Sequence, residues 1–471
     1  MFVRKPLNIL LSVALVAMAG AAHAAVPYTT PVLPVGDAQE MTSPYILADG
    51  WTQKVIANQT NQNALVAGSN SGNWDMIDSN RTGPDANRYL FMPFETSTAG
   101  VQRVDLWDSN YNTRTVTIVA PGTQSFKSGD ASRWTPWGTY LTAEESWSDP
   151  TATGGTAGTS IYGRLFEITN PTTATANGGV FEHRKIGPAD IRASHEGLAF
   201  DKANNFYFID ERNDSHIFKF TSANPNATSG ADFFGAGQTS VLRVGDGSVQ
   251  EAAGAYTWVA LTDANGAALP GTIVGTDGAG LTILDGRATP NVAAFKGTDF
   301  DRPEDMEIRT LADGSQQLFV ATTTNNNVFS LDLDDAVISK FVDHTTIDGE
   351  TGVAVGSVFN SPDNLAIDEN GTMYVIEDQP GGVENLWIAV DADKDGVAES
   401  MSVFATLRTA GAESTGMYAL NGKFYVNVQH PTSGNSLLVE ISPVPEAETY
   451  AMMLAGLGLV GFAASRRKSV K

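Results

Sequence analysis

The chain has 471 residues, a formal net charge of −24 and no cysteine. The strong negative charge argues against nucleic acid and anionic membrane surfaces as partners, and it suits a protein that binds cations. The lack of cysteine excludes disulfides and thiolate ligands but does not by itself identify a compartment. The 46 glycines, together with the scarcity of amphipathic helical patterns between the termini, favour a turn-rich all-β chain.

The N-terminus has the three parts of a secretory signal peptide. Arg4 and Lys5 precede an apolar run that extends over residues 7–19, and the small residues Ala22 and Ala24 frame a cleavage site before Ala25. The apolar run is too short to span a membrane comfortably. We therefore predict that residues 1–24 are a signal peptide and that the protein acquires metals outside the cytoplasm.

The first strands follow an irregular stretch that ends near residue 88. Residues 89–95 alternate as a strand does, and residues 100–107 are the expected partner strand. Residues 135–146 predict another strand, which ends in the paired acids Glu144 and Glu145. In contrast, residues 222–298 contain many Ala, Gly and Asp with few strand signals. We interpret this segment as a strand-poor insertion.

One hairpin pattern recurs within residues 195–211, 300–327 and 362–378. In each copy an acid opens an alternating strand, a turn follows, and an aromatic or β-branched strand returns. Aligned on one another, the opening acids fall at one repeat position: Glu196, Glu304 and Asp363. Two of the return strands close with paired acids: Asp210 with Glu211, and Glu377 with Asp378. Because a hairpin begins and ends at the same edge, these acids are expected to crowd one edge of each sheet.

Repeated hairpins that cannot bury their own apolar faces indicate radial repetition. We predict a single all-β domain over residues 25–443, folded as a β-propeller. The opening acids then converge on one mouth of the central channel. Carboxylates gathered at close range cannot all stay ionised unless cations offset them, so the pattern predicts a polymetal site. The alternative is that these acids are ordinary solvated turn residues.

Two further features lie near the C-terminal end of this domain. Asp391, Asp393 and Asp395 alternate before Gly396, a spacing that suits a structural calcium loop, although an Asp-rich turn is the alternative. Glu413 opens a strand in residues 410–431, and His430 closes its partner. His430 is either a metal ligand, a hydrogen-bond donor to phosphate, or a buried histidine satisfied by the backbone.

The C-terminal residues 444–471 resemble the PEP-CTERM sorting signal of Gram-negative bacteria. Val444-Pro445-Glu446 precedes an apolar run over residues 450–464 and a basic tail at residues 466–468, while Ala447 replaces the usual second proline. The resemblance implies an envelope sorting protease as a partner and transient membrane association through residues 450–464. It implies localisation in the periplasm, at the outer surface or in the extracellular matrix.

A set of motifs spread over residues 85–440 resembles the PhoX-type alkaline phosphatases. The motifs occur in the family's order and are carried by residues 141–145, 195–196, 302–304, 362–363, 413–416 and 428–431. The resemblance implies a six-bladed propeller that releases phosphate from small-molecule monoesters outside the cytoplasm. It also implies a central site that holds a di-iron centre and calcium ions.

The resemblance assigns roles to individual residues. Arg302 corresponds to the guanidinium that grips phosphate, and Glu304 to a carboxylate that serves the metals and the catalytic site. The other implied metal ligands are Glu144, Glu196, Asp210, Asp363 and Glu413. Further acids near these motifs, Glu145, Glu211, Glu377 and Asp378, are secondary candidates together with His430.

One departure from the family concerns the metal. Ala143 stands where the phosphatases carry an iron-binding cysteine, so calcium is expected while iron is in doubt. Three outcomes remain open: other metals in the cluster, reduced activity, or a propeller without phosphatase chemistry. The alternative functions are a non-catalytic calcium-binding surface or matrix protein, and a calcium-dependent propeller hydrolase of the lactonase or phytase type.

Overall fold

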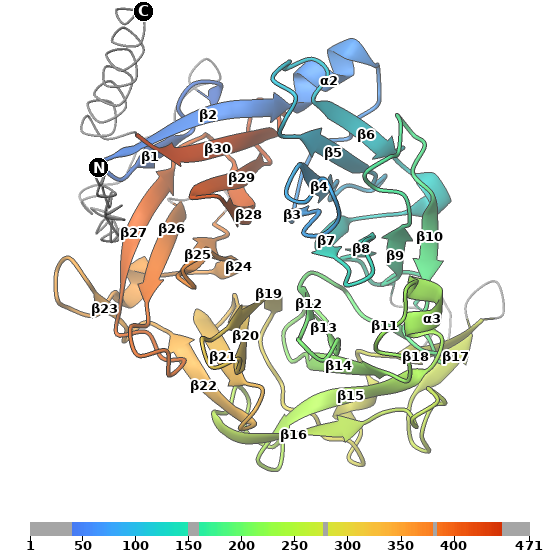
Figure 1. Ribbon diagram of the computed structural model, residues 1–471. Helices are drawn as coiled ribbons and strands as arrows, with labels where there is room; N and C mark the ends of the chain where they lie inside the picture. The colour runs from blue at the N-terminus through green and yellow to red at the C-terminus, as the bar shows by residue number, and fades with distance from the viewer. Residues whose placement is uncertain (1–39, 149–159, 277–280, 380–383, 445–471) are drawn as a thin grey trace, which may run out of the picture.

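The computed structural model describes residues 40–148, 160–276, 281–379 and 384–444. Within these ranges, strands form six antiparallel units of four strands, arranged in chain order around a central axis (Figure 1). Each unit is one blade of a propeller, and its first strand lies nearest the axis. The predicted single β-propeller is confirmed, and the described residues make six blades.

The blades are numbered in chain order. Blade 1 comprises β3 (Asp78–Ser79), β4 (Tyr89–Pro93), β5 (Val101–Asp105) and β6 (Thr115–Val119). Blade 2 comprises β7 (Gly129–Trp134), β8 (Tyr140–Glu144), β9 (Leu165–Ile168) and β10 (Phe181–Arg184). Blade 3 comprises β12 (Leu198–Phe200), β13 (Phe206–Ile209), β14 (Ile217–Ser222) and β15 (Gly237–Val244).

The second half of the ring follows the same plan. Blade 4 comprises β19 (Pro303–Thr310), β20 (Gln316–Thr322), β21 (Asn327–Asp332) and β22 (Val337–Val342). Blade 5 comprises β24 (Pro362–Ile367), β25 (Met373–Glu377), β26 (Glu384–Val390) and β27 (Ser400–Leu407). Blade 6 comprises β28 (Glu413–Leu420), β29 (Lys423–Gln429), β30 (Leu437–Pro443) and β2 (Trp51–Asn58).

Shorter elements complete the sheets. The strands are β1 (Tyr45–Leu47), β11 (Ile191–Arg192), β16 (Gly254–Ala260), β17 (Val274–Thr276), β18 (Thr282–Asp285) and β23 (Ile347–Asp348). The helices are α2 (Gln59–Leu65) and α3 (Gly230–Phe234), with single 3-10 turns at Thr123–Ser125, Thr289–Asn291 and Gly356–Val358.

The ring is closed by a strand from the opposite end of the domain. The N-terminal strand β2 pairs antiparallel with β30 from Trp51 opposite Pro443 to Asn58 opposite Leu437. Strand β16 likewise joins blade 3 to blade 4 by pairing with both β15 and β22. These pairings satisfy strand edges that would otherwise be exposed, and they tie distant parts of the chain together.

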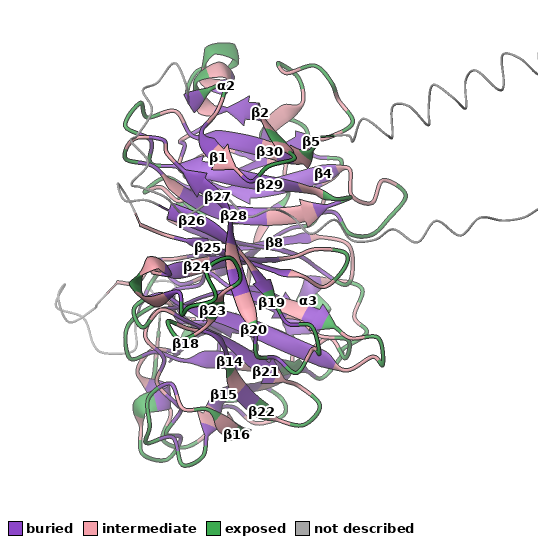
Figure 2. Cartoon of the chain, turned by 90° about the vertical axis from the view of Figure 1, so that its left-hand side faces the viewer, coloured by how far each residue is buried: buried purple, intermediate pink, exposed green. Residues whose placement is uncertain are grey.

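The hydrophobic core lies between the blades. Buried apolar side chains form six clusters, and each cluster joins two neighbouring blades. Phe208 and Phe218 of blade 3, for example, pack in one cluster with Leu141 and Leu165 of blade 2. Because both faces of each sheet are covered, the strands are buried almost throughout, whereas exposed residues lie in the loops (Figure 2). The channel is thereby left to the polar groups of the innermost strands.

The strand pattern of the sequence is confirmed for the repeated hairpins. β12 pairs with β13, β19 with β20, and β24 with β25, each antiparallel across a short turn. The strand predicted over residues 135–146 is shorter than expected, because residues 135–139 form the turn that separates β7 from β8.

The interpretation of residues 222–298 as strand-poor is wrong for its first half. This segment contains β15 and β16, which pair with each other over five residues. Their apolar positions are interrupted by polar residues such as Gln238, Thr239 and Arg243, which hid the strand signal. Only residues 261–298 remain poor in strands, and there β18 pairs in parallel with β11.

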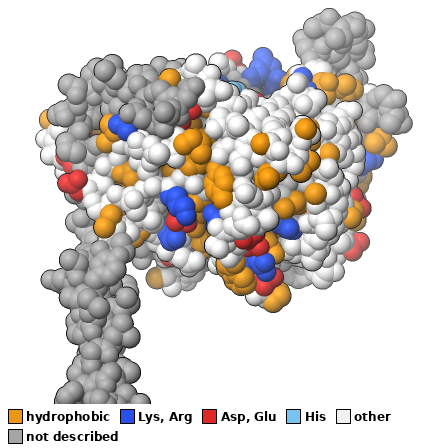
Figure 3. Space-filling view, turned by 90° about the horizontal axis from the view of Figure 1, so that it is seen from above, with side chains coloured by type: hydrophobic (Ala, Val, Ile, Leu, Met, Phe, Trp, Pro, Cys, Tyr) orange, Lys and Arg blue, Asp and Glu red, His pale blue; other side chains and the backbone are white. Residues whose placement is uncertain are grey.

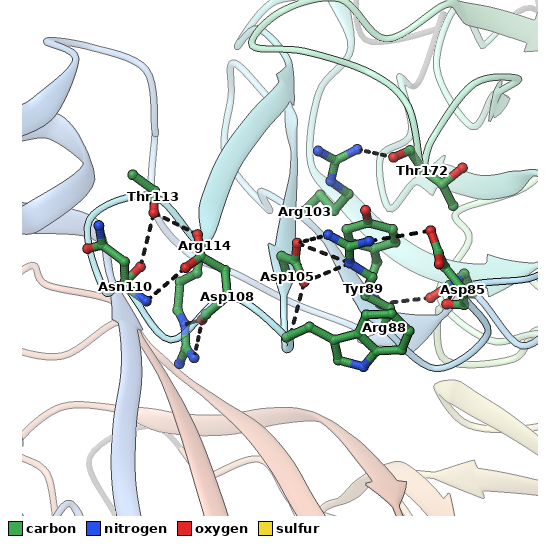
Figure 4. A network of polar contacts seen from close by, with 12 residues as sticks. Asp85, Arg88, Tyr89, Arg103, Asp105, Asp108, Asn110, Thr113, Arg114 and Thr172 are labelled. Carbon is green, nitrogen blue, oxygen red and sulfur yellow. Dashed lines mark hydrogen bonds and ion pairs between the residues drawn. The ribbon is translucent and has the colours of Figure 1, made fainter.

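The outer surface carries charged groups in local pairs and mixed with other residue types (Figure 3). On blade 1, Arg88 donates to Asp105 from Nη2 at 2.7 Å and lies 5.0 Å from the ring centroid of Trp107 (Figure 4). Partly exposed pairs of this kind contribute little to stability and nothing to a reaction. They therefore leave the channel as the place to look for function.

The predicted signal peptide, residues 1–24, lies outside the described residues, and so does the run at residues 450–464. The part of the chain that is described contains no helix long and apolar enough to cross a bilayer.

Candidate metal centre

A first row of acids lies on the innermost strands at one mouth of the channel. The innermost strand of each blade begins at this mouth. Residues at the same register position of these strands therefore converge there. Five blades place an acid at this position: Asp75, Asp130, Glu196, Glu304 and Asp363. The sixth blade places Thr415 there, and its hydroxyl hydrogen-bonds to Asp75. The predicted convergence of Glu196, Glu304 and Asp363 is present in the structure.

A second row follows the second strand of each blade and reaches the same mouth. It consists of Glu95, Glu145, Glu211, Thr323, Asp378 and His430, each placed directly after, or one residue beyond, the end of its strand. Five of these residues donate their backbone N–H to the carbonyl of the residue two positions before the inner acid, at 2.7–3.0 Å. The donors and acceptors are Glu95 and Asn73, Glu145 and Ser128, Glu211 and Ser194, Thr323 and Arg302, and Asp378 and Ser361. This repeated bond fixes the two rows side by side.

Most members of the two rows line a cavity of about 190 Å³. Its walls are formed by eight carboxylates, one guanidinium and one imidazole: Asp75, Glu95, Asp130, Glu145, Glu196, Asp363, Asp378, Glu413, Arg302 and His430. A cavity with this lining cannot attract an apolar ligand. It is suited to cations and to an anion that the cations bring with them.

The tightest group within this wall is formed by Glu196, Glu304 and Asp363, whose ligand oxygens all lie within 4.8 Å of one another. Glu196 and Glu304 are buried, with 4% and 0% of their surface exposed. Glu196 accepts a hydrogen bond from Asn364 Nδ2 at 3.0 Å, and Glu304 accepts one from the hydroxyl of Thr323. Gly197 allows blades 3 and 4 to approach here, because a Cβ on it would lie 2.5 Å from the carbonyl oxygen of Glu304.

The carboxylates repel one another and are poorly hydrated. Burial, followed by the charge of Glu211, raises the pKa of Glu304 to about 7. Burial, followed by Glu95, raises the pKa of Asp75 to about 7 as well, and burial with Asp378 raises that of Glu413 to about 10. Without a counter-charge the group therefore holds protons at neutral pH. A bound cation would return these groups to their ionised form.

Several oxygens in the cluster also lack a partner. Among the described residues, Asp130 Oδ1, Glu304 Oε2 and Asp378 Oδ1 are buried and accept no hydrogen bond. An unpaired buried oxygen costs free energy unless another group, such as a metal ion, satisfies it. Geometry and hydrogen bonding thus agree with the electrostatics in favouring cations at this position.

Arg302 is the one guanidinium in the wall of the cavity. Its Nε and Nη2 lie 2.9 and 2.8 Å from Glu211 Oε1, and Nε lies 3.0 Å from Glu304 Oε1. The residue has a φ of 50°, and its backbone N–H donates to the carbonyl of Arg212. With 38% of its side chain exposed, it remains accessible from the cavity.

The structure does not bring Glu144 and Asp210 into the cavity, contrary to their predicted role as metal ligands. Glu144 is paired with Arg164, at 2.6 Å between Oε1 and Nη2. Asp210 is paired with Arg287, which reaches it from the segment 261–298, at 2.9 Å from each of two nitrogens. Glu144 and Asp210 are each the first of two adjacent acids. Because successive side chains of a strand point to opposite faces, the second acid, Glu145 or Glu211, turns toward the channel.

Glu377 follows the same rule. It accepts hydrogen bonds from Trp387 Nε1 and the backbone N–H groups of Asn360 and Asn385, at 2.8–2.9 Å, inside blade 5. Its neighbour Asp378 lines the cavity. Sequence reasoning placed Glu144 above Glu145 and Asp210 above Glu211, and did not distinguish Glu377 from Asp378, because adjacent acids at a strand end give no signal of which one faces inward.

Glu413 and His430 both line the cavity. Glu413 stands two residues before the inner-row position occupied by Thr415. His430 Nε2 is 3.7 Å from Glu95 Oε2 and 4.0 Å from Glu413 Oε1. A hydrogen bond to Glu95 raises the pKa of His430, so the imidazole carries positive charge over a wider pH range than usual.

Three members of the site were missed from the sequence: Asp75, Glu95 and Asp130. Glu95 closes a predicted strand, so the rule that acids end the second strand of a hairpin could have found it. Asp130 opens β7 within Gly129-Asp130-Ala131, where the pattern has no proline or histidine before the acid. Asp75 lies outside the regular strands, next to an isolated bridge between Trp74 and Phe94.

Ala143, which replaces the family cysteine, is fully buried. It belongs to the apolar cluster between blades 2 and 3, with Ala131 and Leu165. No sulfur ligand is therefore available on this strand. The donors that the cavity offers are oxygens, apart from His430.

The predicted calcium loop is separate from this centre. Asp391, Asp393 and Asp395 lie between β26 and β27, and their ligand oxygens are within 4.8 Å of one another. β24 starts and β25 ends at the cavity, so β26 runs away from it and the loop lies at the opposite edge of blade 5.

Comparisons with known proteins agree with this architecture. A family model described as Alkaline phosphatase PhoX matches residues 131–339, which begin directly after Asp130 and include the hairpins of Glu196 and Glu304. A model of the PEP-CTERM protein-sorting motif matches residues 443–468, almost all of them outside the described residues. No curated protein matches this sequence.

Several solved structures are similar to this chain, and the first of them shares its fold. Pseudomonas fluorescens PhoX in complex with vanadate, a transition state analogue, matches with a TM-score of 0.58 and 16% identity, over 88% of this chain and 98% of that chain. A Bacteroides thetaiotaomicron protein of unknown function gives 0.43 at 12% identity, over 83% and 76%. A putative gluconolactonase gives 0.40 at 11% identity, over 88% and 98%. The resemblance to the PhoX-type alkaline phosphatases, and the PEP-CTERM sorting motif beside it, are thus both shown.

Proposed function

We propose that this protein is an exported, metal-dependent phosphatase that hydrolyses phosphate monoesters in the central cavity. One observation supports the proposal above others. Carboxylates from five blades and Arg302 from the remaining one surround one cavity, in a chain whose residues 131–339 match the PhoX family. An anionic phosphate can enter such an acidic cavity only with cations that reverse its charge locally.

The ligand set fits calcium. Eight carboxylates and the buried unpaired oxygens supply the hard oxygen donors that calcium takes in numbers of six to eight. We assign the metals to Glu196, Glu304 and Asp363, with Asp75, Asp130 and Glu145 as further ligands. A thiolate-bound iron does not fit, because alanine occupies position 143 and is packed in an apolar cluster.

When bound, the cations supply positive charge that neutralises the phosphate oxygens as the ester bond breaks. The protein's own contribution begins with Arg302, whose planar fork can hold two phosphate oxygens at once. Glu211 and Glu304 fix the orientation of that fork before substrate arrives. His430 offers a second donor in the wall of the cavity, with Nε2 4.0 Å from Glu413 Oε1.

Export is indicated by the sorting motif, which is a feature of Gram-negative envelopes. We place the active protein in the periplasm, at the outer surface or in the extracellular matrix. A sorting protease is the partner that such a tail implies, and residues 450–464 are the segment expected to associate with the membrane before processing.

The test is a monoesterase assay with an aryl phosphate, paired with elemental analysis of the purified protein. We expect calcium in the protein, hydrolysis of the monoester, and loss of that activity on extensive chelation. A panel of lactones, phytate and diesters identifies the other hydrolase classes. Metal-dependent thermal stability without turnover of any of these substrates contradicts the proposal and identifies a calcium-bound structural propeller instead.

A further inference from the structure

The loop Asp391–Gly396 lies apart from the proposed catalytic cavity. It connects the end of β26 to β27, and its neighbours are groups at the far ends of the inner hairpins. Arg309, near the end of β19, pairs with Asp391, and Lys394 Nζ donates to the carbonyl of Gly371 in the turn between β24 and β25. The loop therefore belongs to the edge of the propeller opposite the cavity.

One carboxylate oxygen of Asp391 has a hydrogen-bond partner, and the other has none among the described residues. Its Oδ2 is held by Arg309 Nη2, whereas Oδ1 is buried and has no hydrogen-bond partner among the described residues. The residue as a whole is 3% exposed. A buried carboxylate oxygen without a partner is costly, and here it belongs to a group whose three ligand oxygens lie within 4.8 Å of one another.

Arg309 orients this carboxylate without neutralising the loop. Its Nε and Nη2 also donate to Gln317 Oε1, which fixes the guanidinium between two acceptors. Counted together, Arg309 and Lys394 bring two positive charges, while Asp391, Asp393, Asp395 and Glu399 bring four negative charges. The net charge of these six side chains is −2, which one divalent cation would neutralise. Arginine fixing the outer oxygen of a ligand is a common arrangement around bound metals.

We propose that this loop binds one calcium ion and thereby holds blade 5 against blade 4. Asp391, Asp393 and Asp395 are the carboxylate ligands, at the alternating spacing that suits calcium. The loop already contacts blade 4 through its backbone. Gln317 Nε2 donates to the carbonyl of Lys394 at 2.9 Å, and Ser330 Oγ donates to that of Gly396 at 2.6 Å. Because these hydrogen bonds join the loop to blade 4, an ion that orders the loop would also order the contact between blades 4 and 5.

Hydrogen exchange of the full chain measures the site directly. At calcium ten times above the dissociation constant, exchange in residues 391–399 is expected to slow about ten-fold, because opening must release the ion. The Asp393→Ala/Asp395→Ala double variant removes two carboxylate ligands and leaves the buried Asp391–Arg309 pair intact. It is expected to bind one calcium fewer per chain and to lose the protection.

Asp313→Ala is the matched control, since Asp313 is an exposed acid in the turn between β19 and β20. It is expected to keep both the calcium count and the protection. If calcium leaves exchange of residues 391–399 in the unmodified protein unchanged, or if the double variant keeps its full calcium count, the loop does not bind the ion.

Failure of this site and failure of the proposed catalytic function give different results. The double variant is expected to keep its aryl phosphatase activity, because the loop lies on the far edge from the cavity. Asp363→Asn, in the cavity, is expected to lose activity while calcium still protects residues 391–399.

Discussion

Glu211 Oε1 accepts a hydrogen bond from Nε of Arg302 at 2.9 Å and lies 2.8 Å from its Nη2, although 91 residues separate the two side chains. Glu211 ends the second strand of blade 3, and Arg302 precedes the first strand of blade 4. The pair therefore spans two blades at the mouth of the cavity. A guanidinium held in this way is oriented in advance, so little conformational freedom is lost when a substrate binds.

Arg302→Lys is expected to lower kcat/KM for an aryl phosphate by about 10- to 100-fold, because lysine keeps the charge but loses the two-pronged contact. The measurement is steady-state kinetics with saturating calcium. Arg164→Lys is the matched control, since Arg164 pairs with Glu144 outside the cavity lining. Equal losses in the two variants would mean that Arg302 has no special contact with the substrate.

Removing the metals should invert the usual dependence of stability on pH. Burial and neighbouring charge raise the pKa of Glu304 and Asp75 to about 7, and that of Glu413 to about 10, so the folded, metal-free protein binds more protons than the unfolded chain. The free energy of unfolding then falls as the pH rises from about 4, the ordinary carboxyl value, through 7 and toward 10.

Thermal unfolding in excess chelator at a series of pH values measures this effect. Saturating calcium is expected to abolish the fall, because it favours the ionised carboxylates. The stabilisation by calcium should therefore grow with pH. A metal-free protein whose unfolding midpoint rises steadily from pH 5 to pH 9 contradicts the electrostatic account of the cavity.

The acids of the repeated hairpins could be placed from the sequence because two constraints coincide. Glu196, Glu304 and Asp363 each open an alternating strand, and the radial repeat brings those openings to one axis. The choice between Glu144 and Glu145 could not be made in this way. Both acids sit at a strand end, and the packing of the neighbouring blade decides which one turns inward.

The sequence predicted neither Asp75 as a site residue nor β15 as a strand, and the reasons differ. Asp75 reaches the cavity from irregular backbone, held by a hydrogen bond from its N–H to the carbonyl of Pro93. Such positioning depends on contacts distant in sequence. β15 carries polar residues on an outer strand, where the alternation that identifies a half-buried strand is weak.

Because the carboxylates in the cavity repel one another, we expect that removing one of them stabilises the metal-free protein and impairs its function. Asp363→Asn is expected to raise the unfolding midpoint of the metal-free protein at pH 8, by about 1 °C for each kcal/mol of repulsion removed. The same substitution is expected to reduce metal content and to abolish phosphatase activity. Differential scanning calorimetry in chelator, with elemental analysis, measures both effects.

Glu350→Gln is the control for Asp363→Asn, because it removes one negative charge from an exposed loop. Its midpoint is expected to match that of the unmodified protein. If the two variants are equally stable without metals, general net charge rather than crowding in the cavity accounts for the change.

Asp210 and Arg287 form a structural pair, and removing the arginine should reveal that role. Asp210 is fully buried, while Arg287 also lies 4.5 Å from the ring centroid of Trp147. Arg287→Met leaves the carboxylate of Asp210 without its partner, so we expect a loss of about 3 kcal/mol in the free energy of unfolding. The calcium count per chain is expected to stay the same, since neither residue lines the cavity.

Denaturant unfolding and elemental analysis of the folded variant measure the two effects. Loss of bound calcium with stability unchanged would instead place Asp210 among the metal ligands, as the sequence pattern first suggested.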